Sequence, residues 1–140
     1  LLIFYILASR KEQLVDVNKE IEVLQELIKL YNYLPYRNVE MKINITTNFL
    51  IVPGALLFVL EQIIRNTIVS RKRKFTIHIT ENSTFLDVFY QPEDKIIEAI
   101  KPSNFLEIKH VYTIYSNQEI VINELENERK ISIPKLTLKV

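Results

Sequence analysis

The chain has 140 residues, 48% hydrophobic and 25% charged, which is enough for one domain with a proper core and too little for two comfortable ones. With 18 Lys and Arg against 17 Asp and Glu, the net charge of +1 gives no global field that would select nucleic acid or an anionic membrane. Cysteine is absent, which excludes disulfides, thiolate metal sites and cysteine nucleophiles and favours a reducing compartment. The single glycine, Gly54, leaves little scope for loops that approach phosphate closely.

The chain opens with an apolar run, LLIFYILA, followed by the polar connector SRKEQ. This run is far shorter than the roughly 18 residues of a membrane span, and it lacks the basic leader and cleavage site of a secretory signal. We therefore expect residues 1–15 to be the tail of a preceding helix and its connector, with the rest of a larger protein upstream. Residues 16–140 are then the domain itself, which is not embedded in a membrane.

The next segment predicts a helix and a strand. Apolar residues at three- and four-residue spacing indicate a helix that Asp16 or Asn18 caps and that Pro35 ends. A period-two alternation over residues 39–45 then predicts a half-buried strand.

A central helix begins near Pro53, a residue suited to the first turn. Leu57 and Phe58 extend its apolar surface to nearly all sides, which is typical of a buried helix. Its inward stripe is expected to comprise Ala55, Leu56, Val59, Leu60, Ile63 and Ile64.

The second half of the chain begins with two predicted strands, at residues 75–80 and 84–89, which form a hairpin. An irregular polar segment follows at residues 91–104 and a helix at residues 106–115. Two last strands are predicted at residues 119–125 and 129–140. Hairpins interspersed with helices favour an α+β two-layer sandwich. We expect a mixed, mostly antiparallel sheet with helices on one face.

Four local patterns, in this order and spacing, carry a family resemblance: LLIFYIL with VDVNKEIEVLQELIKL, then IVPGALLFVLEQIIRN, SRKRKFTIHI and PSNFLEIKHVYTIY. Together they resemble the C-terminal part of Lyt-type sensor histidine kinases, whose ATP-binding domain shares the fold of gyrase and heat-shock protein 90. The resemblance implies a cytoplasmic domain of a membrane-anchored protein. It also implies a homodimer formed through the upstream helices, to which residues 1–15 would belong, and a response regulator as partner.

In that family the central helix presents a Glu-Asn pair, and the Asn oxygen holds the Mg²⁺ of ATP. The matching positions here are Glu61, the candidate catalytic residue, and Gln62, the candidate Mg²⁺ ligand. Arg65 and Asn66 match the following Lys-His and are candidate ATP-binding residues. The alternative is an ordinary helix surface, with an ion pair between Glu61 and Arg65 and a polar edge formed by Gln62 and Asn66.

The adenine and phosphate positions differ from the family pattern. Tyr90 follows the strand at which a polar adenine-reading residue is expected, and it can either stack on the base or pack in the core. The lid glycines are replaced by residues 102–104, Pro-Ser-Asn, which removes one N–H and stiffens the backbone. Glu107 stands for the Asn that opens the lid helix, which places a carboxylate where phosphate would lie, and Val111 stands for its Arg.

These residues leave open whether the chain is an enzyme, and two main functions are considered. The first is a degenerate ATP-binding domain, a pseudokinase with weak or lost nucleotide binding that acts as a signalling or interaction module. The alternative is an active Mg-ATP-dependent kinase domain that phosphorylates a His upstream of this chain; an unrelated α+β interaction domain is a third, more distant option. Mg-ATP is the cofactor of the alternative, and none is expected for the degenerate domain.

The basic turn at residues 71–74 lacks interleaved aromatics, so no nucleic-acid partner is expected.

Overall fold

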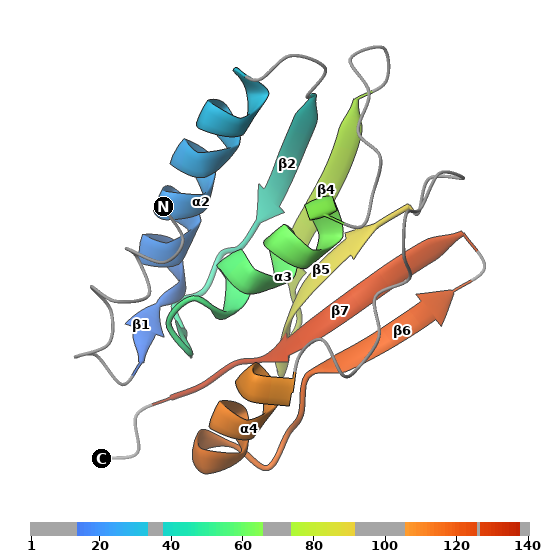
Figure 1. Cartoon of the computed structure of the whole chain (residues 1–140). Helices are drawn as coiled ribbons and strands as arrows, with labels where there is room; N and C mark the ends of the chain where they lie inside the picture. The colour runs from blue at the N-terminus through green and yellow to red at the C-terminus, as the bar shows by residue number, and fades with distance from the viewer. Residues whose placement is uncertain (1–13, 34–37, 66–73, 92–105, 126, 138–140) are drawn as a thin grey trace.

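The computed structural model describes residues 14–33, 38–65, 74–91, 106–125 and 127–137. Its helices are α2 (Val17–Asn32), α3 (Ala55–Arg65) and α4 (Leu106–Tyr115). The main sheet has the strand order β2-β4-β5-β7-β6, formed by Val39–Asn44, Phe75–Glu81, Phe85–Tyr90, Glu128–Pro134 and Val121–Leu125. β2 is parallel to β4, and the other neighbours are antiparallel. Helices α2 and α3 lie over one face of this sheet (Figure 1), which confirms the predicted α+β sandwich.

Most predicted elements are present with small changes at their ends. The helix after Asp16, the first strand, the hairpin and the helix at Leu106–Tyr115 all form. The last strand ends at Pro134 instead of residue 140, because the chain leaves the sheet there and Leu136 exchanges two backbone hydrogen bonds with Leu50, at 2.9 and 3.0 Å. The predicted helix tail at residues 1–8 and the lid residues 102–104 lie outside the described residues.

One small sheet was not predicted. Strand β1 (Val15–Asp16) pairs antiparallel with β3 (Leu50–Ile51), and the two strands anchor the start of α2 beside the segment that leads into α3. Asp16 caps α2, because its side chain accepts a hydrogen bond from the Asn18 N–H at 2.8 Å. At the other end of α2, the Asn32 side chain donates to the Val39 carbonyl at 2.8 Å and accepts from the Val39 N–H at 2.9 Å. The bonds of Asn32 fix the C-terminal end of α2 to the start of β2, and the β1–β3 pair fixes its N-terminal end beside the approach to α3.

Helix α3 is the centre of the helical layer. Six of its residues are buried, and they are Ala55, Leu56, Leu57, Val59, Leu60 and Ile63. Its N-terminus is held by a buried carboxylate of α2: Glu20 accepts from the N–H groups of Gly54, Leu56 and Leu57 at 3.0, 2.8 and 3.4 Å. Gly54 has a φ of 82°, a conformation that glycine adopts without steric cost, so the chain's one glycine lies where the backbone turns into α3.

Candidate functional site around helix α3

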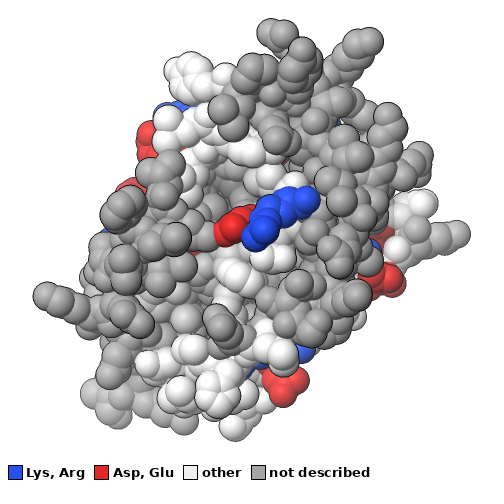
Figure 2. All heavy atoms as spheres, viewed as in Figure 1, with Lys and Arg blue, Asp and Glu red and all other residues white. Residues whose placement is uncertain are grey.

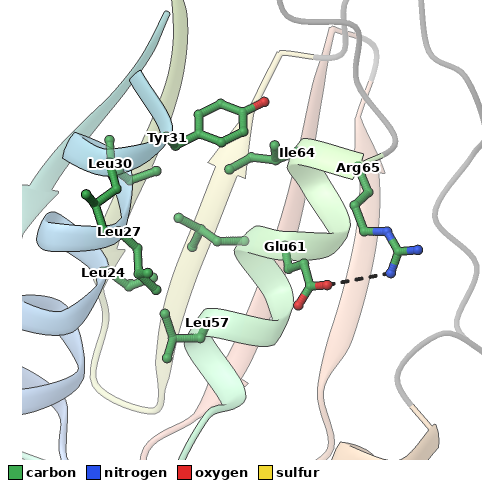
Figure 3. A pocket seen from close by; sticks show the side chains of 10 residues that line it. Leu24, Leu27, Leu30, Tyr31, Leu57, Glu61, Ile64 and Arg65 are labelled. Atoms are coloured by element: carbon green, nitrogen blue, oxygen red, sulfur yellow. Dashed lines mark ion pairs between the residues drawn. The ribbon is translucent and has the colours of Figure 1, made fainter. Parts of the chain in front are cut away.

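A groove lies between the C-terminal half of α2 and most of the length of α3 (Figure 3). Its volume is about 480 Å³. The described residues that line the α2 side are aliphatic except for one tyrosine, and they are Leu24, Leu27, Ile28, Leu30 and Tyr31. The α3 side presents Leu57, Leu60 and Ile64, and Glu61 and Arg65 are the charged residues among the described part of the lining. Ile64, which the sequence places on the inward stripe, is only half-buried, whereas Leu57 is buried although it also lines the groove.

The predicted site residues of α3 form a surface ion pair. The Arg65 guanidinium lies 3.5 Å from the Glu61 carboxylate, with side chains 68% and 37% exposed. Figure 3 shows both side chains directed away from the leucines of α2. In Figure 2, one acidic and one basic side chain lie in contact near the middle of this face, and the described residues visible beside them are mostly uncharged. The contact of Arg65 with Glu61 is the one that the i, i+4 spacing predicts, and an exposed pair of this kind adds only about 0.3–0.5 kcal/mol to stability.

The Mg²⁺ ligand predicted at Gln62 lies on α3 outside the groove lining and is half-buried. Mg²⁺ requires several oxygen ligands in near-octahedral geometry. Within the described ranges, no group of three or more His, Cys, Asp or Glu side chains could hold a metal ion, and the adjacent Glu61 carboxylate is paired with Arg65. A Mg²⁺ site at Gln62 would therefore have to draw most of its oxygen ligands from nucleotide phosphates and water, and the role of Gln62 stays a prediction. Asn66, the next predicted ATP-binding residue, lies outside the described residues.

Tyr90, the predicted adenine-side residue, is packed inside the protein. Its side chain is only 2% exposed, and its ring meets Phe75 edge-on, with the ring centroids 5.9 Å apart and an interplanar angle of 68°. Its hydroxyl oxygen accepts a hydrogen bond from the Arg129 guanidinium at 3.3 Å, and Arg129 also donates to Glu124 at 2.7 Å. Burial raises the pKa of Tyr90 above its ordinary value, so the phenol is neutral at physiological pH.

The helix after the predicted lid, α4, contributes packing. Tyr112 is fully buried and its hydroxyl oxygen accepts from the Val52 N–H at 3.2 Å, which ties α4 to the approach to α3. Burial raises the pKa of Tyr112 well above its usual range, so this phenol is also neutral. Val111, at the position of the family's lid Arg, is half-buried. The side chain of Glu107 lies outside the described residues.

The sequence reasoning missed two residues of this region, Glu20 and Arg129. Both carried a detectable signal. Glu20 lies one turn before Leu24 and next to Ile21 on the apolar stripe of its helix, where a carboxylate needs an internal partner. Arg129 lies on the same face of its strand as the buried residues Ile131 and Ile133, because alternate side chains of a strand point to the same side. Both Glu20 and Arg129 can be recognised as charged residues at a position where the spacing of the apolar residues predicts burial.

The sequence and the structure were both compared with known proteins. No protein-family model and no curated protein matches the sequence. Among solved structures, the cytoplasmic segment of histidine kinase QseC superposes with a TM-score of 0.52, covering 89% of this chain and 80% of that chain at 10% sequence identity. The fold is histidine-kinase-related. At this identity the likeness concerns the fold alone. In the part of the chain that the structure describes, no helix is both long and apolar enough to span a bilayer.

Proposed function

We propose that this chain is a degenerate ATP-binding domain of a two-component sensor histidine kinase, most similar to the Lyt type, which serves as a signalling or interaction module with weak or lost nucleotide binding. The likeness to a histidine kinase cytoplasmic segment supports the kinase-related part of this proposal. The observation that carries the degenerate part is the burial of Tyr90 between Phe75 and Arg129 at the end of β5.

A residue that recognises a base must offer an accessible ring face or a free polar group. Tyr90 offers neither, because its side chain is 2% exposed and its hydroxyl is bonded to Arg129. Admitting a base there would require displacing the ring from Phe75 and leaving the Arg129 guanidinium without this partner, which is costly for a buried charge. The packing therefore supports a nucleotide site that has been filled by side chains.

The α3 surface supports the same proposal. Glu61 is engaged by Arg65 in an exposed ion pair, and the described residues contain no cluster of three or more His, Cys, Asp or Glu side chains that could hold a metal ion without the nucleotide. Residues 102–104 of the sequence supply proline and no glycine where backbone N–H groups would close on phosphate.

Thermal unfolding of the 140-residue chain with and without Mg-ATP tests the proposal. A ligand at about 100 times its dissociation constant stabilises a protein by about 2.7 kcal/mol, which is readily seen as a rise in midpoint. We expect no rise at millimolar Mg-ATP beyond that produced by Mg²⁺ with inorganic triphosphate, which controls for ionic effects. A rise specific to the nucleotide and dependent on Mg²⁺ would overturn the proposal in favour of the active kinase domain.

The proposal also extends to the parent protein. A module of this class would lie in the cytoplasm, belong to a membrane-anchored protein, form a homodimer through helices upstream of residue 16 and act with a response regulator. Fractionation of cells that make the full-length protein tests the membrane anchor. Recovery of the full-length protein in the membrane fraction is expected, and its quantitative recovery in the soluble fraction would contradict this part of the proposal.

A further inference from the structure

The two outermost strands of the main sheet, β2 and β6, present different side chains to solvent (Figure 1). On the sheet face turned away from α2 and α3, β2 carries Glu40, Lys42 and Asn44. Charged side chains on an edge strand discourage the addition of another strand. At the start of β2, the Asn32 side chain also bonds both the N–H and the carbonyl of Val39, at 2.9 and 2.8 Å. The β2 edge is therefore protected by charge and, at its first residue, by a side chain of α2.

Strand β6 presents apolar groups on the same face. Alternation along the strand places Val121, Asn123 and Leu125 there, on the side opposite the buried residues Ile131 and Ile133 of β7. None of the three is charged, and Val121 is 39% and Leu125 55% exposed. Among the strands that the structure describes, β6 is hydrogen-bonded to β7 alone. An edge strand with exposed apolar side chains is a template for pairing with another strand.

The one charged residue of β6, Glu124, points to the other face of the sheet. A charge that points inward from an edge strand can deter strand addition. Here the Glu124 carboxylate accepts a hydrogen bond from the Arg129 guanidinium at 2.7 Å, so its charge is already compensated within the chain. Glu124 therefore leaves β6 able to pair.

We propose that β6 pairs antiparallel with β6 of a second copy of this chain, about a two-fold axis that passes through Asn123. The strand sequence, Val-Ile-Asn-Glu-Leu, is self-complementary in this register. Val121 of each copy lies opposite Leu125 of the other, and the two Asn123 amides face each other. Directly opposed apolar side chains and amides stabilise a pair of strands. A two-fold contact uses the same edge of both copies, so it closes as a dimer and cannot extend into a fibre.

This contact goes beyond the proposed function and does not depend on it. Pairing of two five-residue strands is small beside a standard protein interface, so the dimer forms weakly and reversibly. It is separate from the homodimer proposed through helices upstream of residue 16, and strand pairing requires no nucleotide. The strand contact and the nucleotide proposal can thus fail independently.

Disulfide trapping tests the pairing and its register, because the chain contains no cysteine of its own. Opposed residues of an antiparallel pair have Cα atoms about 4.5–5.5 Å apart, which is within the reach of a disulfide. Asn123→Cys should therefore link two copies under mild oxidation. In Val121→Cys alone, the two cysteines would lie roughly 14 Å apart along the strands, too far for a bond. Lys42→Cys is the matched control, because Lys42 is an exposed residue of the other edge strand.

We expect the Asn123→Cys dimer in a yield several-fold above that of Lys42→Cys and of Val121→Cys. Val121→Cys mixed with Leu125→Cys should give a crosslinked dimer, although each variant alone gives little. Equal yields for Asn123→Cys and Lys42→Cys would show random collision and overturn the proposal. Equal yields for Asn123→Cys and Val121→Cys would overturn the antiparallel register.

Sedimentation equilibrium of the cysteine-free chain gives a second measurement. We expect concentration-dependent dimerisation that Val121→Lys weakens about tenfold or more, because the substitution removes both apolar pairs and adds a charge to each edge. Ile114→Lys makes a similar change at a 70% exposed residue of α4 and should leave the association unchanged. Far-UV circular dichroism confirms that each variant is folded. Association that Val121→Lys leaves intact would overturn the proposal in favour of another surface. A chain that is monomeric at every concentration would overturn it in favour of a strand from a different protein.

Discussion

At the scale of single residues, Glu20 decides how the helical layer is assembled. Its carboxylate is fully buried, and it accepts three backbone hydrogen bonds at the start of α3. A carboxylate at this end of a helix satisfies N–H groups that have no partner within the helix and lies at the positive end of the helix dipole. The residue thus substitutes for a local N-cap, which Val52-Pro53-Gly54 cannot provide from side chains.

Replacing Glu20 with alanine should lower the free energy of unfolding by at least about 3 kcal/mol, because buried N–H groups lose a charged acceptor. Urea unfolding followed by circular dichroism measures this change. Glu22→Ala is the matched control, since Glu22 is exposed on the same helix and should change stability by no more than about 0.5 kcal/mol. Similar losses for the two variants would show that Glu20 does not organise α3.

At the scale of elements, Glu81 joins three segments at one end of the sheet. It lies at the end of β4 and accepts hydrogen bonds from the N–H and hydroxyl groups of Thr46 and Thr47, and Lys135 lies 3.3 Å away. The bond from the Thr47 hydroxyl, at 2.7 Å, is the main reason that the pKa of Glu81 falls from its ordinary 4.5 to about 2. This carboxylate fixes the connection from β2 to β3 against the last strand.

The lowered pKa predicts a specific pH dependence. Glu81 binds its proton less readily in the folded state than in the unfolded state, so its contribution to stability is complete above about pH 4.5 and is lost as the pH falls through 4.5 toward 2. The difference in thermal midpoint between the natural chain and Glu81→Gln should therefore be constant at neutral pH and should shrink in this window. A difference that stays constant down to pH 2 would contradict the prediction.

The elements differ in how well the sequence predicts them. The β4–β5 hairpin and α4 follow from local signals, namely period-two alternation around a turn and helical spacing of apolar residues. The β1–β3 pair could not be found in this way, because strands of two residues contain no period. The parallel pairing of β2 with β4 depends on the crossover through α3, and alternation alone carries no information on strand direction.

The same distinction applies to the candidate site. The contact of Glu61 with Arg65 was predictable because their spacing is local. The burial of Tyr90 does not follow from local sequence, because it depends on Arg129, 39 residues later, and on the register of β5 with β7. Alternation along the strand indicates from the sequence that Arg129 faces the core. That its partner is Tyr90 follows only from the strand order, in which β5 and β7 are neighbours.

At the scale of the whole molecule, one core joins the two layers. The buried cluster extends from Val15 to Leu136 and includes residues of α2, α3, α4 and of the strands β2, β4, β5 and β7. Such continuity predicts that residues 16–140 unfold as one cooperative unit, since no part of the described structure has a separate core. Helix α3 lies at the centre of the cluster, so its core side chains should report on the stability of every element.

Ile63→Ala tests this cooperativity, because Ile63 is fully buried in α3. We expect a loss of about 2–5 kcal/mol in the free energy of unfolding, from lost burial and a remaining cavity. The far-UV signal of secondary structure and the near-UV signal of the buried tyrosines should fall together in one transition, shifted as a whole. Ile114→Ala, at a 70% exposed residue of α4, should leave the midpoint nearly unchanged. If Ile63→Ala shifts one signal and leaves the other in place, the single-domain prediction is wrong.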